Sequence, residues 1–335
     1  MNTRIGNSTL EFDNVGIVSF SSSVGKKEGD GPLKDYFDKI FEDDYIGEDS
    51  WEKAERELQK VTARNALSKA MMSNSDIDMV FAGDLINQCV SANYAMKEFN
   101  TPFFGLYGAC STMAESLILA SMSIASGYSK TAMCVTSSHF CSSEKQFRFP
   151  LEYGGQRTPT SQWTVTGSGA TVLSNTIEDC PKIKRATVGK IVDMGIKDIN
   201  NMGAAMAPAA VSTLKNFFED TNTTPQDYDM ILTGDLGVVG SSLLCEIMDK
   251  EGYNIYEKHN DCGKMIFDIE AQDVHAGGSG CGCGASVLNS YVLKNMVEKK
   301  LKKVIFTATG ALMNPTTVFQ GDSIPGIAHL VYIEV

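Results

Sequence analysis

Short apolar runs alternate with longer stretches of helical periodicity along the chain. Apolar and β-branched side chains dominate the runs, which end in small or polar residues, as buried strands do. The runs that fit this pattern are residues 79–83, 103–107, 130–137, 165–173, 230–233 and 303–310. Residues 51–71 instead repeat apolar side chains at helical spacing after a capping box of Asp49 and Glu52, and residues 111–125 form a second helix. This alternation predicts α/β layers with mostly parallel sheets.

The first half of this pattern returns in the second half. Residues 79–85 (MVFAGDL) correspond to residues 230–236 (MILTGDL), about 150 residues later, and both segments contain Gly-Asp after an apolar run. Residues 130–137 (KTAMCVTS) correspond in the same way to residues 303–310 (KVIFTATG). Matches in the same order at similar spacing indicate an internal repeat.

Between its matched strands, each half also has a Gly-rich turn that opens a helix. The first is residues 108–112 (GACST) and the second is residues 277–284 (GGSGCGCG). Together with the matched strands, these turns indicate a duplicated α/β chain, with residues 1–180 and 181–335 as its halves.

Composition and charge narrow the functional classes. The net charge of −12 and the pI near 4.9 argue against a nucleic-acid surface and against attraction to anionic lipid, so an anionic ligand needs local donors. Residues 1–14 lack the apolar core of a secretory signal, and no run approaches the length of a membrane span. We therefore expect a cytoplasmic protein whose nine cysteines are reduced thiols.

Cys110 is the first candidate for chemistry, because it lies in a small-residue turn at a predicted helix start. The positive end of the helix dipole lowers the pKa of such a thiol, and free backbone N–H groups there also bind carboxylates. His139 and His259 fall where strand ends gather, so either could activate the thiol. Packing of the cysteine and backbone-bonded histidines are the structural alternatives, and both stay open. Cys281-x-Cys283 lacks a second pair, so no metal site is predicted.

Arg148 is the candidate cation for an anionic ligand. It lies in the aromatic stretch of residues 147–156 (FRFPLEYGGQ), where its guanidinium can offer a bidentate fork to a carboxylate. The same stretch can instead pin an interface loop. Both interpretations stay open on the sequence.

Together, the Cys110 turn, the His259 segment and the Gly-rich second-half turn resemble the thiolase superfamily, which includes the ketoacyl synthases. The chain is still more similar to the stage V sporulation protein AD family of endospore-forming bacteria. The segments that carry this resemblance run nearly the full chain: residues 82–88 (AGDLINQ), 108–112 (GACST), 146–150 (QFRFP), 152–156 (EYGGQ), 206–210 (MAPAA) and 259–263 (HNDCG).

The resemblance implies a fold, a ligand and a cellular setting. It implies a homodimer of five-layered αβαβα protomers that binds dipicolinic acid or its calcium chelate and helps move it into the forespore. Its partners would be the other stage V sporulation protein A membrane components, which would hold the protein at the forespore or spore inner membrane. No cofactor is expected, apart from calcium as part of the chelate.

Residue by residue, the resemblance gives Cys110 the nucleophile position and His259 the position of the second-half base in ketoacyl synthases. Where those enzymes place an Asn or second His for the oxyanion site, this chain has residues 277–281 (GGSGC). Loss of such a donor costs on the order of a hundredfold in rate. The resemblance therefore implies a degenerate catalytic site with no established enzymatic activity.

The resulting hypothesis is that the old acyl pocket binds a small rigid dianion. Cys110 and Ser111 at the helix start would meet one carboxylate, and Arg148 the other. Asp84 would orient a histidine or meet calcium of the chelate. The further predicted donors are Ser137, His139 and His259.

Two other classes of function stay open. The chain could be an active ketoacyl synthase or thiolase-type acyltransferase that uses Cys110 to carry an acyl group from coenzyme A. It could also be a scaffold for its partners, with no saturable small-molecule site.

Overall fold

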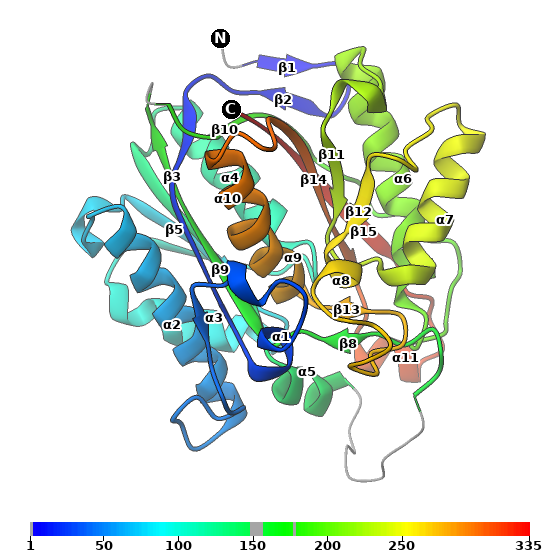
Figure 1. Ribbon diagram of the computed structural model, residues 1–335, viewed down its shortest axis with the longest axis horizontal. Coiled ribbons are helices and arrows are strands. Elements are labelled where there is room, and N and C mark those ends of the chain that lie inside the picture. The colour runs from blue at the N-terminus through cyan, green and yellow to red at the C-terminus, as the bar shows by residue number, and fades with distance from the viewer. Residues whose placement is uncertain (1–2, 148–156, 177–178) are drawn as a thin grey trace.

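The computed structural model describes residues 3–147, 157–176 and 179–335 (Figure 1). Its main element is a mixed sheet in which short strands β1 (Thr3–Ile5), β2 (Thr9–Glu11) and β4 (Lys39–Ile40) flank ten others. In spatial order those ten are β12 (His259–Asp261), β11 (Met230–Thr233), β14 (Lys303–Ala311), β15 (Gly326–Glu334), β10 (Lys182–Thr187), β3 (Val15–Val24), β9 (Gly167–Asn175), β7 (Thr131–Ser138), β5 (Met79–Gly83) and β6 (Phe103–Leu106).

The two halves of this sheet have the same topology. In the first, β5 is parallel to both β6 and β7, β7 is antiparallel to β9, and β9 is antiparallel to β3. In the second, β11 is parallel to both β12 and β14, β14 is antiparallel to β15, and β15 is antiparallel to β10. The halves join where Lys182 of β10 pairs with Gly16 of β3. The predicted duplicated fold is confirmed by this repeat of strand order and direction.

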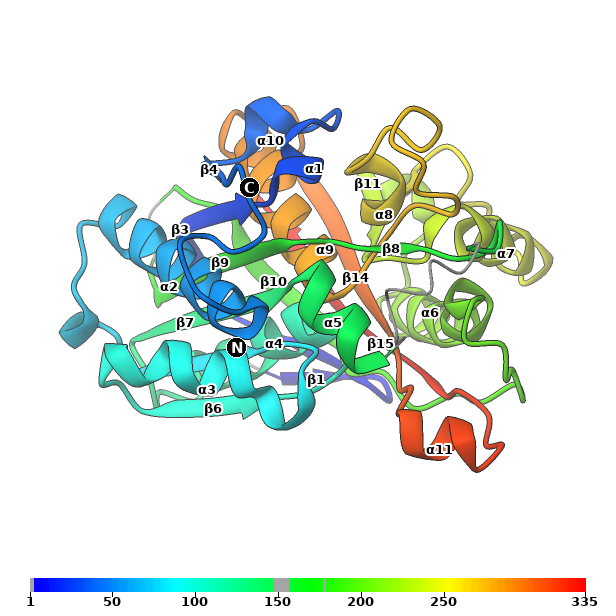
Figure 2. The same ribbon diagram turned by 90° about the horizontal axis from the view of Figure 1, so that it is seen from below.

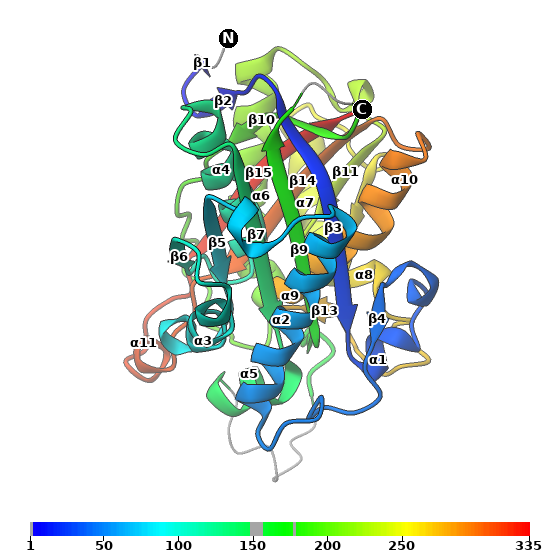
Figure 3. The same cartoon turned by 90° about the vertical axis from the view of Figure 1, so that its left-hand side faces the viewer.

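Helices cover the sheet in layers. The central layer is α4 (Thr112–Ala125), α9 (Cys281–Val287), a π-helical turn (Leu288–Val292) and α10 (Leu293–Val297). One outer layer holds α2 (Trp51–Lys69) and α3 (Val90–Met96), and the other holds α6 (Met202–Thr221) and α7 (Gly237–Lys250) (Figure 2). Figure 3 shows α2 lying across β3 and β9. The shorter elements are α1 (Lys26–Gly29), α5 (Phe140–Phe147), α8 (Cys262–Met265), α11 (Pro315–Phe319), β8 (Trp163–Thr164) and β13 (Gly278–Ser279).

The central helices are apolar or small on most sides because they lie between two halves of the sheet. Helix α4 contacts β5 and β7 of the first half and β14 and β15 of the second. A helix that is buried all round carries no polar stripe. Helix α9 lies so close to β9 that a Cβ atom built at Gly169 would be 2.3 Å from the backbone oxygen of Ala285. The glycine is therefore required by this contact.

Two local expectations differ from the structure. The N-cap of α2 is Ser50, one residue after the predicted Asp49, and its side chain accepts from the Lys53 backbone N–H. Glu52 is therefore the second residue of the helix, cannot close a capping box, and bonds Lys145 of α5 instead. The predicted buried strand at residues 103–107 is the edge strand β6, so Phe104 is 54% exposed. The strand predicted at residues 165–173 is confirmed as β9 (Gly167–Asn175), and the short strand β8 before it pairs with β13 outside the main sheet.

Candidate functional site

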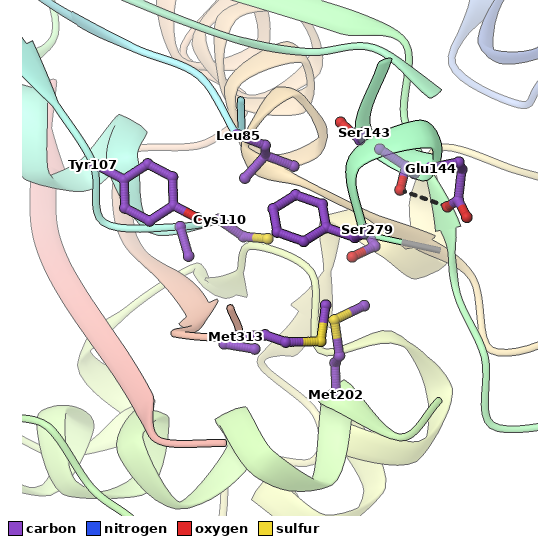
Figure 4. A pocket seen from close by; sticks show the side chains of 12 residues that line it. Leu85, Tyr107, Cys110, Ser143, Glu144, Met202, Ser279 and Met313 are labelled. Atoms are coloured by element: carbon purple, nitrogen blue, oxygen red, sulfur yellow. Dashed lines mark hydrogen bonds between the residues drawn. The ribbon is translucent and has the colours of Figure 1, made fainter. Parts of the chain in front are cut away.

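A small cavity lies beside Cys110, where strand ends of both halves meet (Figure 4). Its volume is about 40 Å³, which is room for a few water molecules. Met202 and Met313 close one side, and Ser143 and Glu144 of α5 form another. The lining residues are Leu85, Tyr107, Ala109, Cys110, Ser143, Glu144, Phe147, Thr164, Met202, Ser279, Ala311 and Met313. Among the residues that the structure describes, no Lys, Arg or His lines it.

A tight turn positions Cys110 at this cavity. Ala109 has a positive φ of 49°, and the turn is closed by hydrogen bonds from Ser111 and Thr112 back to Gly108 and Ala109. Strand β14 presses against the turn, since a Cβ atom at Gly310 would be 2.5 Å from the Gly108 backbone oxygen. The first-half cysteine is thus held against the second half of the sheet.

Asp235, which no local pattern in the sequence marks, is the charged neighbour of Cys110. Beyond the effect of burial, the negative charge of its carboxyl group raises the pKa of the Cys110 thiol. That carboxyl group accepts from the Gly280 backbone N–H at 2.8 Å and from the Thr309 hydroxyl at 2.9 Å. Burial raises the pKa of Asp235 to about 7, although these hydrogen bonds oppose the shift. The site therefore places a buried carboxyl group where the resemblance had suggested an imidazole.

The predicted fall in the pKa of Cys110 is wrong. Burial, and then the negative charge of Asp235, raise its pKa well above the ordinary value for a thiol. Cys110 also precedes the first residue of α4 by two positions, so the helix dipole acts on it only weakly. Removal from water and a neighbouring carboxylate both disfavour a thiolate, and together they outweigh the helix end.

Asp84, the first-half counterpart of Asp235, has a different role. One of its carboxyl oxygens accepts from the Ile86 backbone N–H and the other from the Ala92 backbone N–H, each at 2.7 Å. It orders the loop after β5 and does not line the cavity. Burial raises its pKa, and burial together with the charge of Asp84 also raises the pKa of the nearby Glu55 carboxyl group.

Of the other predicted donors, Ser111 and Ser137 are buried and already bonded. The Ser111 hydroxyl donates to the Gly108 backbone oxygen at 2.6 Å. The Ser137 hydroxyl donates to Glu55 and accepts from Gln59. Neither lines the cavity, so their hydrogen bonds hold the turn and the strand beside the cavity in place.

The two predicted histidines also lie away from Cys110. His259, on edge strand β12, bonds the Thr233 hydroxyl at 3.0 Å and the Cys245 thiol at 3.4 Å. His139, at the start of α5, bonds the Asp44 backbone oxygen at 2.8 Å. The structure therefore brings neither imidazole into the cavity, which contradicts the placement of His259 as the base beside Cys110. Arg148 lies outside the described residues.

Cys281 is the second-half counterpart of Cys110, and the two belong to one buried cluster with Leu85. The Cys281 thiol donates to the Ser137 backbone oxygen at 2.9 Å. The site thus has an approximate internal symmetry in which each half places a cysteine near an acidic residue of the other half. Asp235 could have been found from the sequence, because it occupies the same position in the second half of the repeat as Asp84 in the first. Over the described ranges, no three His, Cys, Asp or Glu side chains come together in a way that could hold a metal ion.

The buried ionisable groups predict that the protein loses stability as pH rises from 5 to 8. Burial raises the pKa of Asp235 and Glu28 to about 7 and that of Asp261 to about 6, so the folded state holds protons that the unfolded state has released. The stability that these groups contribute is lost as pH rises through their pKa values in the folded state. The free energy of unfolding then falls by up to about 1.4 kcal/mol per pH unit for each group.

Three histidines act in the opposite direction. Burial lowers the pKa of His259 to about 3, that of His329 to about 4 and that of His139 as well, so they disfavour folding below pH 6.5. The carboxyl groups are more numerous, because burial also raises the pKa of Glu55 and Asp84, and above pH 6.5 the histidines have little further effect. The melting temperature measured by calorimetry should therefore fall between pH 5 and pH 8, with a smaller fall in Asp235→Asn. A melting temperature that rises over this range would contradict the assignment of these protons.

The layers and the cavity between the two halves define a thiolase-like protein. The solved structure of 3-oxoacyl-[acyl-carrier-protein] synthase III from Aquifex aeolicus VF5 matches with a TM-score of 0.58 and 13% identity, covering 96% of this chain and 100% of that one. An OleA variant from Xanthomonas campestris matches with a TM-score of 0.64 and 12% identity, covering 97% and 99%. At these identities the likeness shows the fold alone.

The chain belongs to the stage V sporulation protein AD (SpoVAD) family. The profile of that family matches residues 6–334. The Stage V sporulation protein AD of Bacillus subtilis (strain 168) is 46% identical over 330 residues, which is 98% of this chain and 97% of that protein. The protein is therefore a sporulation protein built on a thiolase-like fold.

Proposed function

We propose that this protein binds dipicolinic acid, free or as its calcium chelate, in the cavity beside Cys110 and takes part in its uptake into the forespore. The family supports the sporulation setting. The proposed location rests on the cavity at the nucleophile position of the fold. There Cys110 lies beside a buried carboxyl group, and no histidine of the described residues lines the cavity. Such a site favours binding over condensation.

Ligand entry requires side chains to move. The cavity of about 40 Å³ is smaller than a pyridine ring with two carboxylates. Two of its walls are the flexible side chains of Met202 and Met313, which adapt to new shapes at small cost, and Phe147 closes a third. We infer that these three side chains shift when the ligand binds.

The buried carboxyl group of Asp235 beside Cys110 opposes a bare dianion. Burial raises the pKa of this carboxyl group to about 7, so it can hold a proton when an anion is near. We infer that dipicolinate enters either with a proton held by Asp235 or as the neutral calcium chelate, and that no cofactor is needed beyond that calcium.

Transport by this protein would depend on partners in the membrane. No helix in the described ranges is long and apolar enough to cross a bilayer. We propose that the chain captures the ligand and hands it to the other stage V sporulation protein A components, which hold it at the surface of the forespore or spore inner membrane. Titration calorimetry with dipicolinate, with and without calcium, tests the binding step: saturable binding near one ligand per chain is expected.

The rival function, acyl transfer from coenzyme A, predicts a covalent intermediate on Cys110. We expect none, because the raised pKa of Cys110 leaves little thiolate and its charged neighbour is Asp235 rather than an imidazole. Mass spectrometry after incubation with acetyl-CoA should show no gain in mass. An acetyl adduct that is absent in Cys110→Ala, followed by turnover, would establish an acyltransferase instead.

We propose that the protein is a homodimer joined through β6. This strand ends the sheet, and the exposed aromatic residues Tyr94, Phe104 and Tyr107 lie on or beside it. Two copies of an edge strand can pair antiparallel about a two-fold axis. Light scattering should give a dimer for the wild type and for Phe319→Lys, which changes an exposed residue on α11, but a monomer for Phe104→Lys. A monomeric wild type would refute the proposal.

A further inference from the structure

We propose that the hydroxyl groups of Tyr107 and Ser143 are the two donors that hold the carboxylates of dipicolinate, one at each end of the ligand. The inference rests on the proposed function and adds to it the residues that recognise the ligand. Both side chains line the cavity beside Cys110 (Figure 4). Tyr107 directly follows β6, and Ser143 lies on α5. No local pattern in the sequence marks either residue as a donor.

Neutral donors have to hold an anion in this cavity. Among the described residues, no Lys, Arg or His lines it. An anion that is removed from water without a positive charge nearby is stabilised by hydrogen bonds from hydroxyl or N–H groups. The hydroxyl groups that line the described part of the cavity are those of Tyr107, Ser143, Thr164 and Ser279. Recognition of a carboxylate therefore depends on which of these hydroxyl groups can still donate a proton.

Two of these hydroxyl groups already donate their protons within the protein. The Thr164 hydroxyl donates to the Glu144 carboxyl group at 3.1 Å, and the Ser279 hydroxyl donates to the Asp235 carboxyl group at 3.3 Å. A hydroxyl group has one proton, so neither residue can donate to a ligand without giving up its present acceptor. Tyr107 and Ser143 remain as the hydroxyl donors for a carboxylate in the cavity.

Ser143 supplies the independent sign of a ligand. It is 2% exposed, and its hydroxyl has no hydrogen-bond partner among the described residues. A buried hydroxyl without a partner lowers stability, so native proteins seldom leave one unless a water, ion or ligand completes it. Of the buried polar atoms that lack a partner in the described chain, the Ser143 hydroxyl is the one on the wall of this cavity. Its proton is therefore available to a ligand there.

Tyr107 supplies the second hydroxyl group. The residue is 44% exposed, but its hydroxyl points toward Cys110 (Figure 4). Burial of this hydroxyl, and then the neighbouring thiols of Cys110 and Cys281, raise the pKa of Tyr107 above its ordinary value. The phenol therefore keeps its proton at neutral pH, and a neutral phenol donates a hydrogen bond to a carboxylate.

The shape of the ligand fits two donors on different walls. Dipicolinate is planar and has one carboxylate on each side of its ring nitrogen. Figure 4 shows Tyr107 and Ser143 on opposite sides of Cys110. One hydroxyl group can therefore meet each carboxylate. In the calcium chelate, the outer oxygen of each carboxylate still faces away from the metal, so the same two hydroxyl groups can hold either form of the ligand.

The test compares Tyr107→Phe and Ser143→Ala with wild type by titration calorimetry with dipicolinate and with picolinate, which has a single carboxylate. Each variant should bind dipicolinate about tenfold or more weakly, with and without calcium, because it loses a hydrogen bond to a charged group. Picolinate should weaken by no more than about twofold in either variant, because its ring can turn over and present its carboxylate to the remaining hydroxyl group. In the double variant, picolinate should also weaken about tenfold.

The chain offers a matched control for each variant. Ser241 of α7 is 3% exposed and also has a hydroxyl without a partner among the described residues, but it does not line the cavity. Tyr128 is 83% exposed and lies outside the cavity. Ser241→Ala and Tyr128→Phe should therefore bind both ligands like wild type.

Stability separates recognition from a structural role. Removal of a buried hydroxyl without a partner does not lower stability, so Ser143→Ala should melt at or above the wild-type temperature although it binds dipicolinate more weakly. Unchanged dipicolinate binding in either variant, or equal weakening of dipicolinate and picolinate, would overturn the two-donor proposal while leaving the cavity as the binding site. A folded wild type that binds neither ligand would instead refute the proposed function itself.

Discussion

Gly169→Ala should lower the free energy of unfolding by about 3 kcal/mol, as measured by urea denaturation. The new methyl group would lie 2.3 Å from the backbone oxygen and 2.6 Å from the carbonyl carbon of Ala285. Both atoms belong to helix α9, which cannot shift without disturbing its other contacts with β7 and β3. The clash therefore tests the central packing of helix against sheet on which the cavity depends.

Gly284→Ala, on α9 itself, is the control for this substitution. A Cβ atom there would be 3.2 Å from Cζ of Phe306, a side-chain atom that can give way. In a helix, Ala is also preferred to Gly by about 1 kcal/mol. We expect little net change in stability. Equal losses in both variants would mean that α9 and β9 are not packed as described.

Ala311→Leu should weaken dipicolinate binding by at least about tenfold, which corresponds to ~1.4 kcal/mol. Ala311 ends β14 and lines the cavity, so the three additional carbon atoms would occupy space that the ligand needs. The substitution changes no charge and no hydrogen bond of the site. Loss of affinity in this variant would follow from volume alone.

Two checks keep this result interpretable. Circular dichroism and the melting temperature should show that Ala311→Leu remains folded, since overpacking of a buried site costs about 1–3 kcal/mol. Ala271→Leu, an exposed alanine away from the cavity, makes the same change in side chain and should bind like wild type. Undiminished binding by a folded Ala311→Leu would place the ligand elsewhere.

The fold could be predicted from the sequence because its signals are local and occur twice. The apolar runs of β5 and β11 both precede Gly-Asp, and β7 and β14 follow at similar spacing, so the order of elements alone indicated a duplication. What periodicity could not give was the position of each strand in the sheet. An apolar run such as residues 103–107 has the same composition at an edge as in the centre, which is why the exposure of Phe104 was missed.

The candidate site was predictable only in part. Cys110 was selected correctly as a residue of the cavity, because a cysteine in a Gly-rich turn before a helix has a local signature. Asp235 and Ser143 have none. Their roles come from the approach of β11 and α5 to the Cys110 turn, which is a tertiary contact. His259 was assigned by resemblance, and the structure instead bonds it to Thr233 and Cys245 on the edge of the sheet.

The pairing of Cys110 with Asp235 also explains how a thiolase-like fold can keep its cysteine without its chemistry. A carboxylate beside the thiol raises the pKa of Cys110, whereas an imidazole would accept its proton and leave a thiolate. The same carboxyl group, with a pKa of about 7, can hold a proton when an anion is near. One residue thus opposes covalent catalysis and permits anion binding.

The most direct test of the central claim is titration calorimetry of the wild-type protein with dipicolinate at pH 6.5, with and without calcium, beside Cys110→Ala and His259→Ala. We expect saturable binding near one ligand per chain, altered affinity in Cys110→Ala, which changes the cavity wall, and wild-type affinity in His259→Ala, whose side chain lies outside the cavity. No binding of either ligand by the folded wild type, or loss of binding only in His259→Ala, would contradict it.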